Sequence, residues 1–119
     1  MGQNTSTVAK NLLIRLRQLN VTELFQIPGD YVKNFTNQLG IFLGIKISGT
    51  TNELDAAFAA DAYGRTRRMA AVSLQYGVSP FSALNAVAGA YVKRRPVIVI
   101  SAIPSAKDRK KTKSTNHNK

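Results

Sequence analysis

Three short stretches of this chain hold the side chains that could do chemistry. Asp30 follows Pro28 and Gly29, Glu53 follows Asn52, and a third loop, residues 76–78, is centred on a glycine; each comes after a short apolar run. Carboxyl groups can accept hydrogen bonds and handle protons. If the apolar runs are parallel strands, all three stretches lie at the carboxyl edge of one sheet, where open α/β folds bind ligands. The spacing therefore predicts a ligand site at that edge.

Both carboxyl groups also have a purely structural interpretation. Thr50-Thr51-Asn52-Glu53 fits the S/T-x-x-E capping box, in which the glutamate returns to the backbone at the helix start. Alternatively Asn52 caps the helix and Asp55 takes the glutamate's role. Asp30 is equally suited to cap the helix that follows it. On the residues alone, capping is the stronger interpretation of Glu53.

The elements that must position these residues alternate along the chain. Apolar periodicity predicts helices over 8–19, 31–39, 53–63 and from 79 to the basic run at 93–95. Shorter apolar runs predict strands over 23–27, 45–48, 69–74 and 97–101. Ser6 or Thr7 is available to cap the first helix, and Asn20 suits the left-handed residue after it. Four strands, each reached through a helix, predict an α/β domain with an open parallel sheet and flanking helices, an incomplete doubly wound arrangement.

The pattern also predicts which helix faces are buried and where helices stop. Gly40 and Gly64 are expected to end the second and third helices. In the fourth helix Ser79 is expected as N-cap and Pro80 at the first helical position. The residues expected on the buried faces are Val32, Phe35 and Leu39 in the second helix, Leu54, Phe58 and Ala62 in the third, and Phe81, Leu84, Ala88 and Tyr91 in the fourth. The apolar run 97–101 is expected to be a buried strand.

Composition excludes several function classes. The chain has 119 residues and no cysteine, so disulfides and cysteine-based metal sites are excluded. Its one histidine, His117, lies in a polar stretch, so we do not expect a histidine-rich metal site or an internal Ser/His/Asp triad. No apolar run has the length of a signal peptide or membrane span, which predicts a cytoplasmic protein. The net charge is +11, and residues 106–119 hold six basic residues and one acidic residue. We expect one domain, 1–105, and a basic disordered tail, 106–119. The tail and the basic run at 65–68 are interpreted as solvated charge rather than a nucleic-acid site, and no metal site is predicted.

Three motifs, in this order and at these spacings, resemble one family: FQIPGDY, NELDAAFAADAYGR and YGVSPFSALNAVAGAYVKRRPVIVISA. Over roughly residues 7–105 the chain resembles the N-terminal pyrimidine-binding (PYR) domain of thiamin diphosphate-dependent 2-oxo acid decarboxylases, the pyruvate and indolepyruvate decarboxylase group. The resemblance implies that Glu53 is the activating glutamate, which hydrogen-bonds the cofactor's aminopyrimidine and promotes loss of the thiazolium C2 proton. It also implies that Asp30 handles protons on the reacting substrate. The residues implied beside the cofactor are Pro28, Gly29, Gln75 and Gly77.

The chain also departs from this family. It lacks the adjacent histidine pair and the Gly-Asp-Gly motif that binds metal and diphosphate, Gln75 stands where many members have threonine, and Ser79-Pro80 replaces a Gly-acidic pair. The resemblance therefore implies a truncated domain that binds only the pyrimidine end of thiamin diphosphate and is inactive alone. Magnesium and diphosphate would be held by a missing domain or partner chain. The alternative is a non-catalytic module or split subunit that docks on such a partner or forms a homo-oligomer. The implied reaction is non-oxidative decarboxylation of a 2-oxo acid to an aldehyde.

Overall fold

Four parallel strands form the centre of the molecule. The computed structural model describes residues 6–67 and 69–110. Within them one sheet has the order β2-β1-β3-β4, built from β1 (Glu23–Gln26), β2 (Lys46–Gly49), β3 (Ala70–Leu74) and β4 (Val97–Ser101). Each neighbouring pair is parallel. The predicted α/β fold with an open parallel sheet is therefore confirmed.

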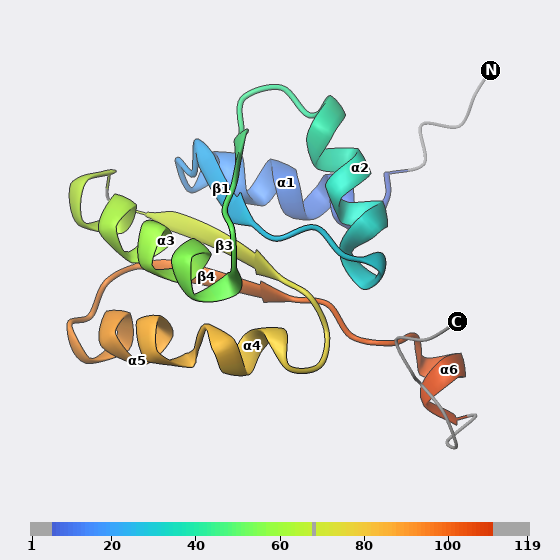
Figure 1. Ribbon diagram of the computed structural model, residues 1–119. Helices are drawn as coiled ribbons and strands as arrows, with labels where there is room; N and C mark the ends of the chain where they lie inside the picture. The colour runs from blue at the N-terminus through green and yellow to red at the C-terminus, as the bar shows by residue number, and fades with distance from the viewer. Residues whose placement is uncertain (1–5, 68, 111–119) are drawn as a thin grey trace.

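Helices cover both faces of this sheet (Figure 1). On one face α1 (Val8–Gln18) and α2 (Lys33–Ile41) pack over a first apolar cluster, which includes Leu13, Leu24 and Ala71. On the other face α3 (Glu53–Arg67), the short α4 (Ser79–Ser82) and α5 (Leu84–Val92) flank a second cluster. Because successive strand residues point to opposite faces, Ala71 joins the first cluster and Val72 the second. The sheet is thus sandwiched between two helical layers.

The predicted ends of the first helix agree with the structure, whereas the second helix differs in detail. The Thr7 hydroxyl accepts the Lys10 amide at 3.1 Å and caps α1, and Asn20 has the left-handed φ of 62° expected after it. The second helix differs in detail, because a 3-10 turn, η1 (Asp30–Val32), precedes α2. Gly40 does not end that helix, which continues to Ile41. Val32 and Leu39 are buried as predicted, and Phe35 is half-buried.

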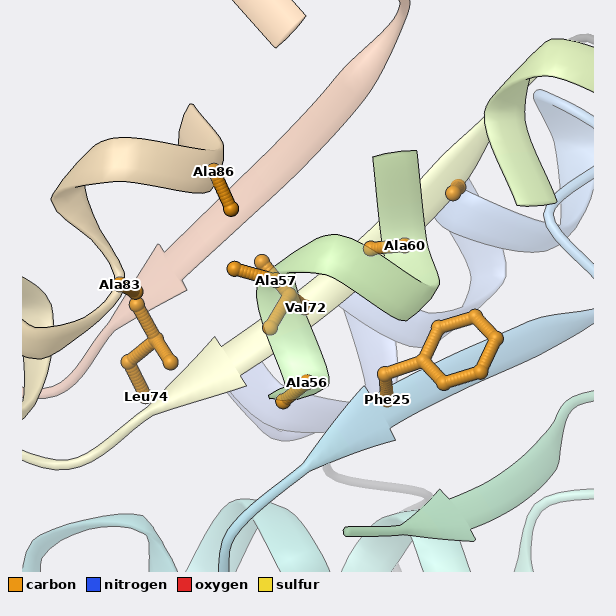
Figure 2. Close-up of a cluster of buried hydrophobic side chains, with 9 residues drawn as sticks. Phe25, Ala56, Ala57, Ala60, Val72, Leu74, Ala83 and Ala86 are labelled. Carbon is orange, nitrogen blue, oxygen red and sulfur yellow. The ribbon is translucent and has the colours of Figure 1, made fainter. Parts of the chain in front are cut away.

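The predicted face of the third helix is wrong. Phe58 and Ala62 are exposed and Leu54 is only half-buried, while the buried residues of α3 are Ala56, Ala57, Ala60, Asp61 and Gly64. Figure 2 shows the alanines of α3 lying over β1 and β3, beside Phe25 and Val72. Small side chains let the helix approach its neighbours closely, so the large ones are turned outward.

Gly64 is part of this close packing and does not end α3. A β-carbon at Gly64 would lie 3.6 Å from the Pro96 carbonyl oxygen and 3.7 Å from the Val97 side chain, and the helix continues to Arg67. The glycine therefore marks a close approach between α3 and the start of β4, not a helix end.

The predicted buried face of the fourth helix is also wrong. It divides into α4 and α5, and Val78 rather than Ser79 occupies the N-cap position. Its buried apolar residues are alanines at 83, 86 and 90, whereas the four residues predicted to be buried, Phe81, Leu84, Ala88 and Tyr91, are exposed. Ala83 and Ala86 pack in one cluster with the alanines of α3, where only small side chains separate the two helices (Figure 2).

The prediction that 97–101 is a buried strand is also wrong. β4 pairs with β3 alone among the described strands, and its residues are half-buried or exposed. After β4, residues 106–110 form a short helix, α6 (Ala106–Lys110), whose residues are all exposed. The rest of the expected tail, 111–119 with His117, lies outside the described residues, as does Arg68 of the basic run. No helix in the described ranges is long and apolar enough to cross a membrane.

Candidate functional site

The three predicted stretches meet at the carboxyl edge of the sheet. β1 leads into Pro28, Gly29 and Asp30, β2 leads into the turn before Glu53, and β3 leads into the loop that contains Gly77. The strands are parallel and β1 lies between β2 and β3, so the three loops leave the same edge side by side (Figure 1). This is the edge at which open α/β sheets bind ligands.

The loops after β1 and β3 are in direct contact. The Tyr31 amide donates to the Gln75 side-chain oxygen at 3.2 Å, and the Tyr31 and Tyr76 rings meet edge to face with centroids 5.3 Å apart. The backbone amide of Gln75 donates to the Ser79 hydroxyl at 3.1 Å. Gly77 has a φ of +94°, a conformation that favours glycine and turns the chain from β3 into α4. The structure thus joins two loops that lie far apart in the sequence.

Glu53 is the first residue of α3, but it does not cap that helix. The Asp55 amide donates to the Asn52 side-chain oxygen at 2.9 Å, and the Asp55 carboxylate accepts from Thr51 (2.6 Å) and Asn52 (2.8 Å). Of the two capping arrangements that the sequence allowed, the structure therefore has the one built from Asn52 and Asp55. The Glu53 side chain is half-buried, and its carboxylate makes no hydrogen bond or ion pair within the described residues.

Asp30 likewise makes no capping bond. It is exposed and begins η1, whose N-cap, Gly29, has an extended backbone and no side chain to offer. Asp30 borders an open hollow of about 340 Å³ whose wall also includes Pro28, Gly29 and Lys33. Asp30 is therefore an exposed residue at the border of this hollow, which Lys33 also lines.

A larger groove on the α1/α2 face was not predicted from the sequence. This groove, about 630 Å³ in volume, lies between the two helices and the end of β4, with Leu12, Phe35 and Ile100 among its apolar walls and Tyr31 at one side. Its walls come from three separate segments of the chain, so no local motif marks it. A metal centre is not evident: residues 6–67 and 69–110 contain no group of three or more His, Cys, Asp or Glu side chains that could hold an ion.

Comparison with known proteins places the chain among its relatives. Residues 6–119 match the family described as thiamine pyrophosphate enzyme, N-terminal TPP binding domain. The chain is 43% identical over 111 residues to the alpha-keto-acid decarboxylase of Mycobacterium avium (strain 104), which covers 93% of this chain and 20% of the relative. The corresponding protein of Mycobacterium ulcerans is 46% identical over 99 residues, which is 83% of this chain and 18% of the relative. The chain thus spans about a fifth of the length of the curated relatives it matches.

Solved structures share the fold at lower identity. The benzoylformate decarboxylase of Polynucleobacter necessarius superposes with a TM-score of 0.83 at 18% identity, over 96% of this chain and 21% of that one. A putative thiamin diphosphate-dependent enzyme of Mycobacterium smegmatis gives the same TM-score at 21% identity, over 97% of this chain and 22% of that one. The sheet order, the helix layers and the sequence match agree, and the chain belongs to the family of thiamine pyrophosphate enzyme N-terminal TPP-binding domains.

Proposed function

We propose that this chain is the pyrimidine-binding part of a thiamin diphosphate-dependent 2-oxo acid decarboxylase, with Glu53 and Asp30 as its catalytic carboxyl groups. One observation carries the proposal. Asn52 and Asp55 form the N-terminal cap of α3, so the half-buried Glu53 at the ligand-binding edge is not needed as a cap. A carboxylate in that position is available to a ligand.

The residues present fit the pyrimidine end of the cofactor. A ring nitrogen of an aminopyrimidine is a suitable hydrogen-bond partner for the unpaired Glu53 carboxyl, and the missing side chain of Gly77 would let a flat ring approach the backbone of the loop after β3. When bound, thiamin diphosphate would supply a thiazolium ring that takes up the electron pair released by decarboxylation. Glu53 would hold a proton for that ring nitrogen, and partial exclusion of water would strengthen the hydrogen bond.

Asp30 has a different role because its surroundings differ. It borders an open hollow, so its carboxylate can exchange protons with solvent and with a substrate held at the same edge. Pro28 and Gly29 line this hollow with Asp30. The loop after β3, which carries Gln75 and Gly77, contacts their loop through the Tyr31–Gln75 hydrogen bond. We propose that these four residues border the space that the pyrimidine would occupy.

The diphosphate and magnesium end requires more protein than this chain supplies. The curated relatives are about five times longer, since the chain covers 20% of the Mycobacterium avium protein. We therefore place the diphosphate and Mg²⁺ on a further domain or a partner chain, either a homologue or a second type of subunit. The exposed apolar side chains Phe58, Phe81, Leu84 and Tyr91 offer the surface on which that protein would dock. The same surface supports the second candidate function, a non-catalytic docking module.

A chimera separates these two functions. This chain replaces the matching N-terminal fifth of the Mycobacterium avium relative, and exchange of the cofactor's C2 proton is followed by NMR in the parent chimera, Glu53→Gln and Asp55→Asn. Glu53→Gln should slow exchange by about a hundredfold or more, comparable to the loss of a preorganised charge-stabilising group. Asp55→Asn, two residues along the same helix turn, is the matched control and should leave exchange nearly unchanged. Equal exchange in the parent and Glu53→Gln would leave only the docking function.

A further inference from the structure

Gly29 is a glycine for a steric reason. Its φ of −172° and ψ of 166° are ordinary extended values that any residue adopts, so the backbone conformation does not call for glycine. A β-carbon at Gly29 would instead lie 2.5, 2.6 and 2.9 Å from the three terminal atoms of the Gln75 amide. The missing side chain therefore makes room for Gln75, which lies directly over the loop after β1.

Gln75 is itself held in place and holds the same loop a second time. Its backbone amide donates to the hydroxyl of Ser79, which is only 3% exposed, and its side-chain oxygen accepts the Tyr31 amide at 3.2 Å. The edge-to-face contact of Tyr31 with Tyr76 adds a further link between the two loops. Asp30 lies between the two residues that Gln75 touches, Gly29 and Tyr31.

We propose that Gln75 is a positioning residue for Asp30. Its side-chain amide contacts the residues on both sides of Asp30 and so fixes the backbone that carries this residue at the border of its hollow. This clamp stands on the geometry alone, whereas its importance for catalysis rests on the proposed function of Asp30. Gln75 thus acts on the loop after β1 in addition to bordering the cofactor space.

The clamp predicts an unusual separation of effects. The atoms that a β-carbon at Gly29 would meet are the far end of a flexible side chain, which can swing aside. Gly29→Ala should therefore cost little folding stability and yet displace the Gln75 amide from the Tyr31 N–H group. Gln75→Met, similar in shape but without an acceptor, should free the same amide. Gln75→Glu keeps an acceptor oxygen and should retain the bond.

Amide hydrogen exchange of the ¹⁵N-labelled full chain tests this. Loss of a hydrogen bond of ordinary strength corresponds to an exchange rate at Tyr31 that is about threefold to tenfold higher. We expect this rise in Gly29→Ala and Gln75→Met and parent behaviour in Gln75→Glu. The Lys46 amide, bonded to the Thr22 carbonyl at 2.8 Å at the opposite edge of the sheet, is the internal reference and should not change.

The double variant completes the test. If both changes act through one hydrogen bond, Gly29→Ala combined with Gln75→Met exchanges no faster at Tyr31 than either single variant. Additive effects, an unchanged Tyr31 in Gln75→Met, or equal acceleration at Lys46 would overturn the proposal. In the chimera, Gln75→Met should lower kcat with KM nearly unchanged, and Gln75→Glu should restore it. If the chimera shows no C2-proton exchange while the Tyr31 amide of the variants exchanges as expected, the proposed function is contradicted. The contact between Gln75 and the loop after β1 is not.

Discussion

The buried alanine face of α3 makes a quantitative prediction for Ala60→Leu. Ala60 is fully buried beside Phe25 and Val72, between α3 and the sheet (Figure 2). Leucine adds three carbon atoms where the surroundings leave no space, and such overpacking costs about 1–3 kcal/mol. Alanine and leucine have similar helix propensities, so the helix itself contributes little to the difference. For a domain of this size, a loss of about 2 kcal/mol lowers Tm by roughly 10 °C.

Ala62→Leu is the matched control. Ala62 lies two residues further along the same helix and is exposed, so the same change should alter stability by less than about 0.5 kcal/mol. Thermal unfolding followed by circular dichroism, together with urea midpoints, measures both variants. The packing described for α3 would be refuted if Ala60→Leu melted within about 2 °C of the parent, or if Ala62→Leu were equally damaging.

Three further outcomes follow from the structure. Asp55→Asn should lower the Tm of the isolated chain by a few degrees, corresponding to about 0.5–1 kcal/mol for a damaged cap, while Glu53→Gln should leave the Tm unchanged. A lower Tm in Glu53→Gln and an unchanged Tm in Asp55→Asn would show that Glu53 is the cap. The 119-residue chain alone, given thiamin diphosphate and magnesium, should release no aldehyde from pyruvate, phenylpyruvate or indolepyruvate; release above background in a coupled assay contradicts this. Light scattering should show self-association that is reduced in Phe81→Ser and Tyr91→Ser, since both side chains are largely exposed; a monodisperse parent monomer counts against it.

Much of the fold could be predicted because its signals are local. Thr7 and Asn20 lie within a few residues of the helix ends that they specify, and apolar runs separated by helices are enough to predict parallel strands. The carboxyl edge follows from the same pattern, because every strand enters its loop in the same direction. The sequence therefore placed Asp30, Glu53 and Gly77 at one edge without any knowledge of tertiary contacts.

The predictions that were wrong concern features that depend on contacts between segments far apart in the sequence. Phe58 and Tyr91 were expected inside because large apolar side chains usually gain most from burial. The contact among α3, α5 and the sheet is instead narrow and is filled by alanines. The position of β4 at the edge of the described sheet depends on strand order, which an apolar run does not encode. The fit of Gln75 over Gly29 joins two loops and has no signature in either of them alone.

The separate roles of Glu53 and Asp55 at the start of α3 affect how the two positions can evolve. Asp55 and Asn52 cap the helix and Glu53 does not. If Glu53 has the role proposed above, a mutation at 53 would abolish cofactor chemistry without lowering the amount of folded protein. Selection for folding therefore protects Asp55 but not Glu53. Among orthologous chains from related organisms, glutamate at 53 would be retained only where the chemistry is still under selection, and an acid at 55 in either case. These two neighbouring positions would then record separately whether the chain is kept as a catalyst or only as a folded domain.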